Sequence, residues 1–394
     1  SHRDRIDRRT FIHRTGAWLT LGAAGCATVA PRRPSSEKQD RFPLPFAEVS
    51  GEPYDCGRAL GRRFAPQINT VLRRRSAQID EMLRFVEADP ASRYQPFLDA
   101  GKRHFPEIVS ELSGWADGAG VPFKKLLVFN LKAELKAMMQ KRREEAGCST
   151  LVFSRSGQGQ LIAHNEDNDV SFADQMFFIK VKPTGKSWFL CQCYPGILPG
   201  NAPGLNGAGL VLTTNFIAST RWKAGIPRYF IDRAVLGARS PSEAIKIVCH
   251  PQRAFAFHYN IGSTSGTPKI WSVETSVDRH VVREVEGLYA HTNHLVLPAT
   301  REAGQDDDYV RTSSMPRYRA LSRHVEQLAG RQVTGSDLIA GLSSHEGRPY
   351  SPCRHVTNSV RGTTVACSLF DLQRRSWLFF KGHPCAGRSS RIPV

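Results

Sequence analysis

The character of the sequence changes abruptly at Cys148, and this change restricts the fold more than any other feature. Residues 42–146 read as mainly helical, because apolar side chains recur with a period close to 3.6 between Arg58 and Val86. After Cys148, short apolar runs alternate with turn residues, beginning with strand, glycine-rich turn and strand over residues 150–163. Many antiparallel strand pairs with inserted helices predict a layered α+β core.

The remaining elements are predicted from the same two periodicities. Further helices are expected over residues 105–119, 123–141, 227–236, 241–249, 317–328 and 335–342. Further strands are expected over residues 176–181, 187–194, 209–214, 256–261, 269–276 and 377–381.

The first thirty residues have the form of an export signal. The pair Arg8-Arg9 precedes a bulky apolar pair, as in twin-arginine signals, and an uncharged stretch follows that is shorter than the roughly 20 residues of a membrane span. Cys26 ends a segment that resembles a lipoprotein cleavage box, and the polar residues 31–41 suit a linker. We expect a signal over residues 1–30 and an exported protein, periplasmic or anchored to the membrane by lipid on Cys26. An apolar N-terminal helix of a cytoplasmic protein is the alternative.

The composition excludes several classes of protein. Hydrophobic residues make up 40% and charged residues 23% of the chain, which excludes a disordered chain and a multi-span membrane protein. The net charge is +18, but the basic excess is spread over both parts of the chain. Without a basic patch interleaved with aromatics, or zinc-finger spacing, the charge alone does not predict a nucleic-acid partner.

Cysteine usage is too sparse for a disulfide scaffold, with nine cysteines in 394 residues. In an oxidising compartment one or two disulfides can form, and the sequence leaves their pairing open. The cysteines available for them are Cys191, Cys193, Cys249, Cys353, Cys367 and Cys385. The pairs Cys191/Cys193 and His291/His294 lack further ligands at a suitable spacing. We therefore predict neither a metal nor a cofactor.

Cys148 follows Gly147 at the start of a strand, where a lone cysteine is more often a core residue than a nucleophile. Polar blocks later in the chain change this interpretation. They are His164-Asn165-Glu166-Asp167, Gly204 to Leu210 with the strand that ends at Asn215, His291-Thr292-Asn293-His294, and Pro352-Cys353-Arg354-His355.

These blocks, in this order, resemble the acyl-coenzyme A:6-aminopenicillanic acid acyltransferase family of N-terminal nucleophile hydrolases. The resemblance runs from Glu52-Pro53-Tyr54, with Gly57 and Gly61, to Gly382-His383-Pro384-Cys385. It therefore covers nearly the whole chain after the signal, and a more distant likeness is to the bile-salt and penicillin V amidases. Each motif is weak alone, but the ordered set is specific.

The resemblance implies a four-layer αββα sandwich and a precursor that cuts itself between Gly147 and Cys148. Residues 42–147 would form the helical α-chain or propeptide part, and residues 148–394 the nucleophile-bearing β-chain. The two chains would stay associated as one domain. After cleavage the free α-amine of Cys148, with an ordinary pKa near 7.7–8.0, would act as base for its own thiol.

The resemblance also implies roles for other residues. Asp167 corresponds to the carboxylate that fixes the α-amine and the substrate, Asn293 to the oxyanion-hole amide, and Arg354 to the basic residue beside the nucleophile. Taken singly, each has an ordinary structural explanation: a turn cap, a turn residue before a strand, and a surface cation. Asn215 is the expected second polar group of the pocket, and Asn206 is its rival.

The second block departs from the family, which usually has Arg-Asn-Trp-Asp where this chain has His164-Asn165-Glu166-Asp167. His164 would replace the missing arginine only below about pH 6.5, where imidazole carries a charge. The missing tryptophan indicates a different pocket wall, and so a different substrate. We expect His164 and Asn165 to contact that substrate.

The sequence thus predicts an exported, self-processing enzyme that cleaves or transfers acyl groups at linear amide bonds of a small molecule. An acyl-Cys148 intermediate would be resolved by water or by an amine, and water is favoured outside the cytoplasm. The alternative is a surface-tethered ligand-binding protein on the same fold.

Overall fold

The computed structural model describes residues 41–140, 147–301 and 304–394. The motifs Arg8-Arg9 and Cys26, the predicted signal over residues 1–30 and all but the last residue of the linker lie outside the described residues. Within these ranges, no helix has both the length and the apolar character needed to cross a membrane.

The first part of the chain is mainly helical, as predicted. Its elements are β1 (Phe46–Gly51), α2 (Pro53–Arg63), α3 (Ala65–Arg74), α4 (Ser76–Ala88), α5 (Pro90–Arg93), α6 (Gln95–His104), α7 (Pro106–Ala119), α8 (Phe123–Asn130) and α9 (Lys132–Met138). The apolar stripe over residues 58–86 is divided among α2, α3 and α4 rather than forming one helix. Pro66 stands in the first turn of α3, where its missing N–H and fixed φ favour a new helix start.

Strand β1 was not predicted. It pairs in parallel with β4 at the edge of a sheet otherwise built from the second part of the chain. The two parts therefore share one sheet.

The second part alternates strands and helices. Its first elements are β2 (Gly147–Arg155), β3 (Gly159–Asp169), β4 (Phe177–Pro183), β5 (Phe189–Cys193), β6 (Gly204–Asn206), β7 (Leu210–Phe216), α10 (Arg228–Val235), α11 (Pro241–Val248), β8 (Phe257–Ser263), β9 (Lys269–Thr275), β10 (His280–Glu284) and β11 (Gly287–His291). Its last elements are α12 (Pro298–Arg301), α13 (Asp307–Tyr309), α14 (Met315–Gln327), α15 (Gly335–Leu342), β12 (Gly362–Asp371), β13 (Ser376–Lys381) and β14 (Ser389–Ile392). Short single turns cover Val170–Phe172 and Pro384–Ala386, and a π-helical segment covers Val310–Ser314.

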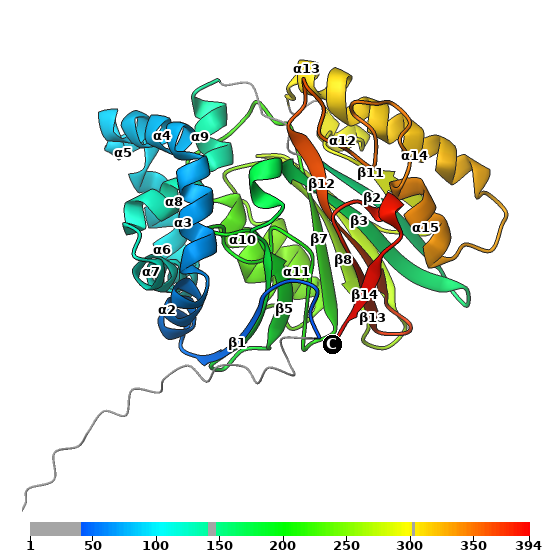
Figure 1. Cartoon of the computed structure of the whole chain (residues 1–394), viewed down its shortest axis with the longest axis horizontal. Helices are drawn as coiled ribbons and strands as arrows, with labels where there is room; N and C mark the ends of the chain where they lie inside the picture. The colour runs from blue at the N-terminus through cyan, green and yellow to red at the C-terminus, as the bar shows by residue number, and fades with distance from the viewer. Residues whose placement is uncertain (1–40, 141–146, 302–303) are drawn as a thin grey trace, which may run out of the picture. The chain divides into compact units, whose positions relative to one another are not determined.

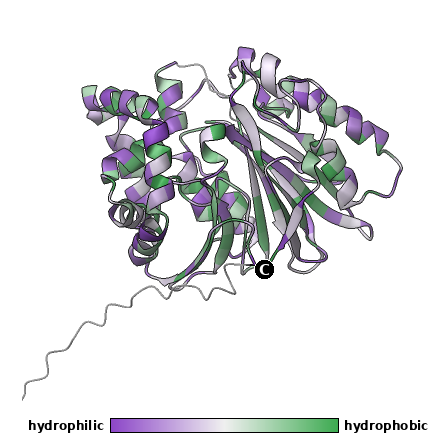
Figure 2. Ribbon diagram, in the orientation of Figure 1, coloured by the Kyte–Doolittle hydropathy of each residue, from purple (hydrophilic) through white to green (hydrophobic). Residues whose placement is uncertain are grey.

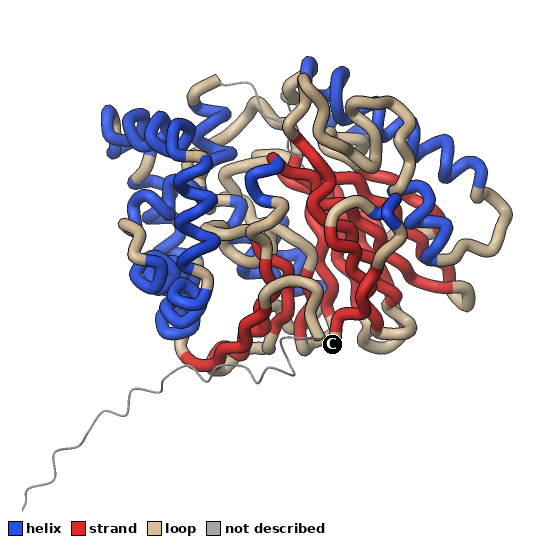
Figure 3. Tube along the Cα trace, viewed as in Figure 1, coloured by secondary structure: helices blue, strands red, loops and turns tan. Residues whose placement is uncertain are grey.

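The strands form two sheets that pack face to face. In the described part, one sheet has the order β1-β4-β5-β6-β7-β8-β9-β10 and the other β11-β2-β3-β12-β13-β14. Phe178 of the first sheet packs edge-on against Trp377 and Phe379 of the second, with ring centroids 5.4 and 5.0 Å apart. Figure 3 shows these strands between two sets of helices.

The outer faces of both sheets are covered by helices. Helices α2 to α9 lie on one side of the strands, and α14 and α15 on the other (Figure 1). Phe177 points away from Phe178 and stacks on Phe64, which lies between α2 and α3. Leu151 and Leu161 of the second sheet pack with Leu321 and Leu338 of α14 and α15. Apolar residues gather along the strands and hydrophilic residues on the outer helices (Figure 2). The chain is thus an α+β protein with the predicted four-layer αββα order.

The polar block after Ala163 corrects one prediction. We expected it to follow the strand, but β3 continues through it to Asp169. The block can remain in a strand because β2 and β12 flank β3 and pair with its backbone. Neighbouring side chains of a strand point to opposite faces, so His164 and Glu166 project to one face of the sheet and Asn165 to the other.

Candidate active site

Cys148 is the second residue of β2 and lies opposite Glu166 of β3. Its side chain is largely buried, and with Gly147, Glu166 and Asp167 it lines a cavity of about 90 Å³. Arg75, among other residues, lines both this cavity and a larger cleft of about 990 Å³. The predicted nucleophile therefore lies at a small cavity beside a wider cleft.

Asn293 contacts the backbone of the predicted nucleophile. Its Oδ1 accepts a hydrogen bond from the Cys148 backbone N–H at 2.9 Å, while its Nδ2 donates to the Phe216 carbonyl oxygen at 2.7 Å. The backbone N–H of Asn293 in turn donates to the Ser314 hydroxyl at 2.8 Å. Asn293 is fully buried, so these contacts hold its amide in one orientation.

Arg317 supplies a positive charge at this point. Its guanidinium donates to the Cys148 carbonyl oxygen at 2.6 Å, to Oδ1 of Asn293 at 2.7 Å and to the Ser149 hydroxyl at 3.2 Å. The side chain is fully buried on α14. Its planar fork therefore joins the backbone of Cys148 to Asn293, a geometry that lysine would not reproduce.

Asp167 and Arg354 also meet beside Cys148. Oδ1 of Asp167 accepts a hydrogen bond from the Thr364 hydroxyl at 2.6 Å, and its Oδ2 lies 3.9 Å from Nε of Arg354. Burial raises the pKa of Asp167, and the positive charges of Arg354 and Arg317 only partly offset this effect. Among the described residues, Oδ2 of Asp167 has no hydrogen-bond partner, so it remains open to a ligand or a new amine.

The thiol of Cys148 is protonated in this environment. Burial raises its pKa well above the usual value, and the negative charges of Glu166 and Asp167 raise it further. A hydrogen bond from the Asp167 backbone and the charge of Arg317 act in the opposite direction. A nucleophilic role for Cys148 would therefore require a base, because the thiolate is the reactive form of a cysteine.

His164 is not placed to be that base. The ligand atoms of Cys148, His164 and Glu166 lie within 4.8 Å of one another, but both ring nitrogens of His164 have other partners. Nδ1 lies 2.7 Å from the Thr150 hydroxyl and Nε2 lies 3.0 Å from Glu166, which also accepts from the Tyr194 hydroxyl at 2.7 Å. The arginine that contacts the Cys148 backbone is Arg317.

Comparisons with known proteins identify the family of this chain. Residues 154–385 match the sequence profile of the acyl-coenzyme A:6-aminopenicillanic acid acyl-transferase family. The chain belongs to this family. It is 27% identical over 373 residues to the beta-alanyl-dopamine/carcinine hydrolase of Drosophila melanogaster, covering 87% of this chain and 94% of the relative.

A solved structure is also similar, that of a mutant conjugated bile acid hydrolase from Clostridium perfringens. Its TM-score is 0.41 at 13% identity, and the match covers 59% of this chain and 89% of that one. Membership of the acyl-transferase family identifies the chain as an enzyme that hydrolyses amides or transfers acyl groups, and not as a binding protein on the same fold.

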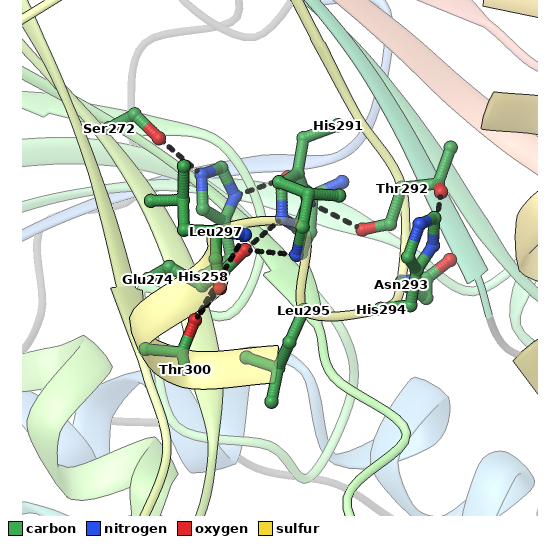
Figure 4. A network of polar contacts seen from close by, with 12 residues as sticks. His258, Ser272, Glu274, His291, Thr292, Asn293, His294, Leu295, Leu297 and Thr300 are labelled. Carbon is green, nitrogen blue, oxygen red and sulfur yellow. Dashed lines mark hydrogen bonds and ion pairs between the residues drawn. The ribbon is translucent and has the colours of Figure 1, made fainter. Parts of the chain in front are cut away.

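In this member of the acyl-transferase family, the segment that carries Asn293 is held by a buried network (Figure 4). Glu274 accepts hydrogen bonds from the backbone N–H groups of Val296 and Leu297 at 2.8 and 3.0 Å, and lies 3.1 Å from Nε2 of His291. Burial opposes the charge of Glu274, but its hydrogen bond and ion pair with His291 lower its pKa overall. The network fixes the chain on both sides of Asn293.

The residues predicted to contact the substrate have hydrogen-bond partners within the protein. Asn165 donates hydrogen bonds to the carbonyl oxygens of Leu342 and Pro352, both at 2.9 Å. It thereby connects β3 to the end of α15 and to the segment that follows this helix. Asn215 accepts a hydrogen bond from the Thr150 hydroxyl at 2.9 Å. Among the described residues, the cavity wall formed by β7 consists of Thr214 and Phe216.

The rival residue, Asn206, is bound to the carbonyl oxygens of Leu236 and Ala238 at 3.1 and 2.7 Å. Its side chain holds the segment that follows α10 against β6.

Arg317 is the site residue that sequence reasoning missed. A signal for it was present, since Arg317 stands four residues before the buried Leu321 on the predicted helix 317–328. A charged residue at an apolar-stripe position indicates burial, and a buried arginine requires partners.

Proposed function

We propose that the protein is a self-processing cysteine amidohydrolase of the N-terminal nucleophile type, with Cys148 as nucleophile. The observation that carries the proposal is the hydrogen bond from the Cys148 backbone nitrogen to Asn293. Cleavage of the Gly147–Cys148 bond would turn this nitrogen into a free α-amine already held at the site. An amine beside its own thiol supplies the base that the buried Cys148 lacks.

Cleavage of the Gly147–Cys148 bond needs no reactant other than water. The Cys148 sulfur attacks the Gly147 carbonyl carbon, and the peptide C–N bond breaks as the C–S bond forms. The thiol proton goes to the departing nitrogen, which becomes the α-amine. Water then hydrolyses the thioester and leaves Gly147 as a carboxylate and Cys148 as a free thiol.

Catalysis would repeat this chemistry on a substrate amide. The α-amine takes the thiol proton, the sulfur attacks the substrate carbonyl, and the proton passes to the leaving amine. The acyl-Cys148 thioester is then resolved by water. Asp167 supports the protonated amine, because its Oδ2 is buried and has no hydrogen-bond partner among the described residues.

The cavity also suggests the charge of the substrate. Lys132 and the buried Arg228 line the same cavity as Cys148, and within the described ranges Nε and Nη1 of Arg228 have no hydrogen-bond partner. Burial, followed by repulsion from Arg75 and Arg228, lowers the pKa of Lys132 well below its usual value. We propose that the substrate carries an anionic group that pairs with Arg228 and favours the protonated form of Lys132, unlike the β-alanyl amides for which the Drosophila relative is named.

Intact mass measurement and N-terminal sequencing of the purified protein test the self-processing proposal. We expect a chain that begins at Cys148, and we expect Cys148→Ala to remain uncut. Cys249→Ala is the matched control and should be processed normally. A wild-type protein that is never cut at Cys148 would refute self-processing.

Hydrolysis of 4-nitroanilides with succinyl, butyryl and β-alanyl groups tests the substrate charge separately. We expect the succinyl amide to have the highest kcat/KM, and Lys132→Met to reduce its advantage over the butyryl amide. A preference for the β-alanyl amide would overturn the charge proposal and leave the amidase proposal standing.

Export through the twin-arginine route, with lipid on Cys26, remains part of the proposal. It rests on the sequence motifs alone. Replacing Arg8-Arg9 with two lysines should retain the protein in the cytoplasm, and Cys26→Ser should release it from the membrane fraction. Unchanged fractionation of both variants would contradict export and anchoring.

A further inference from the structure

Two cysteines and two histidines from three separate segments meet outside the active site. His345 follows α15, Cys353 and His355 lie in the loop before β12, and Cys385 lies in the short turn Pro384–Ala386. Their nitrogen and sulfur atoms all lie within 4.8 Å of one another. Cys353 is buried, the histidines are partly buried, and Cys385 is exposed.

The distances match a tetrahedral arrangement. Nε2 of His355 lies 3.1 Å from Nε2 of His345, 3.6 Å from Sγ of Cys353 and 3.5 Å from Sγ of Cys385. Ligands at about 2.0–2.3 Å from a zinc ion, arranged tetrahedrally, lie roughly 3.3–3.8 Å apart. Small side-chain movements would therefore place all four atoms around one ion.

We propose that His345, Cys353, His355 and Cys385 form a structural metal site for Zn²⁺ or a similar soft divalent cation. Two thiolates and two neutral imidazoles are a ligand set that favours zinc over magnesium or calcium. Binding releases one proton from each thiol, so the two thiolates balance the charge of the ion and no redox partner is needed.

A third histidine packs against the cluster. His383 stacks on His355 with ring centroids 3.8 Å apart, and its own Nε2 lies 2.9 Å from the Thr363 hydroxyl.

The site bears on catalysis through Arg354, which stands between two of its ligands. The Arg354 guanidinium reaches toward Asp167 and donates to the Ser313 hydroxyl at 3.0 Å. A metal held by Cys353 and His355 would fix the backbone on both sides of this arginine. Arg354 is thus a residue that the metal site would position.

Metal content and cobalt spectroscopy of the full chain test the site. The protein, purified and fully reduced, should bind one equivalent of Zn²⁺. Titration with Co²⁺ should produce the visible absorption of a tetrahedral thiolate site. Cys385→Ser should reduce metal affinity by at least tenfold. This exposed position tolerates serine without a cost to folding, and the matched control Cys249→Ser should bind like the wild type.

A disulfide between Cys353 and Cys385 is the competing explanation. Thiol counting on the unreduced protein and metal uptake after reduction separate the two. If the reduced wild type takes up no stoichiometric metal, or if Cys249→Ser loses as much affinity as Cys385→Ser, the metal site is wrong. An increase in the melting temperature with Zn²⁺ in the wild type, absent in Cys385→Ser, supports it independently of activity.

Discussion

The side-chain oxygen of Asn293 accepts a hydrogen bond from the backbone N–H of Cys148, and its side-chain nitrogen donates one to the carbonyl oxygen of Phe216. In the single chain, Asn293 is therefore an acceptor toward the predicted nucleophile. The oxyanion-hole role predicted from the sequence requires its nitrogen to face a developing negative charge instead. The two roles place opposite demands on the same amide, and substitutions can separate them.

Asn293→Ala should lower kcat of the processed enzyme by about 10²–10³ with little change in KM, because an oxyanion donor acts mainly in the transition state. Asn293→Asp keeps an acceptor for the α-amine but loses the donor, so it should be at least as damaging. Steady-state amide hydrolysis by both variants decides the matter. If Asn293→Asp retains kcat within about threefold of the wild type, the residue only holds the amine.

Arg317→Ala should raise the pH at which Cys148 reacts. The positive charge of Arg317 lowers the pKa of this thiol, so its loss leaves less thiolate at any given pH. The variant also removes the Arg317 donor from the buried Cys148 carbonyl, at a cost of about 1–3 kcal/mol in the free energy of unfolding. The measurement is the rate of alkylation by iodoacetamide as a function of pH.

Arg317→Lys and Arg319→Ala are the companion variants. The lysine keeps the charge and should restore most of the pH profile but not the stability. Arg319 is exposed on the same helix and should behave like the wild type. An unshifted alkylation profile in Arg317→Ala would show that this charge does not tune the thiol.

His294 should make the protein less stable in acid. Burial, followed by the charges of His291 and Arg317, lowers its pKa to about 3. The unfolded chain takes up this proton near pH 6.5, whereas the folded chain resists it until about pH 3, so stability falls as pH decreases across this window. We expect His294→Gln to remove up to about 1.4 kcal/mol per pH unit of this decline.

Denaturant unfolding at pH 7 and pH 4 measures the effect. His280→Gln, at an exposed position, is the control and should change the pH dependence much less. Parallel pH dependence in the wild type and His294→Gln would assign the acid sensitivity to other groups.

Gly57→Ala should destabilise the contact between α2 and α7. A Cβ at this position would overlap the carbonyl oxygen of Glu111, a backbone atom that cannot move without shifting the helix. Overpacking of this kind costs about 1–3 kcal/mol in the free energy of unfolding. At Gly237 the nearest atom lies 3.4 Å from an added Cβ, so Gly237→Ala should be nearly neutral. Equal effects in the two variants would refute the close-packing argument.

The sequence alone was sufficient for features that depend on neighbouring residues. The helical periodicity before Cys148 predicted helices, and the short apolar runs between turn residues after it predicted strands. The ordered polar blocks predicted the family. The same local reasoning failed where a contact overrode it. Strand β1 forms because a distant strand pairs with it, and β3 continues through polar residues because two strands flank it.

Only the tertiary structure decided which groups meet. Arg317 reaches Cys148 across a separation of 169 residues, and Asn293 reaches it across 145. Likewise, His345, Cys353 and Cys385 come together only because β12 and β13 bring the end of the chain back to the loop after α15. Periodicity reports which face of an element is buried, but not what that face will contact. The partner of a buried charge or ligand is set by how the layers pack, and that information is spread over the whole chain.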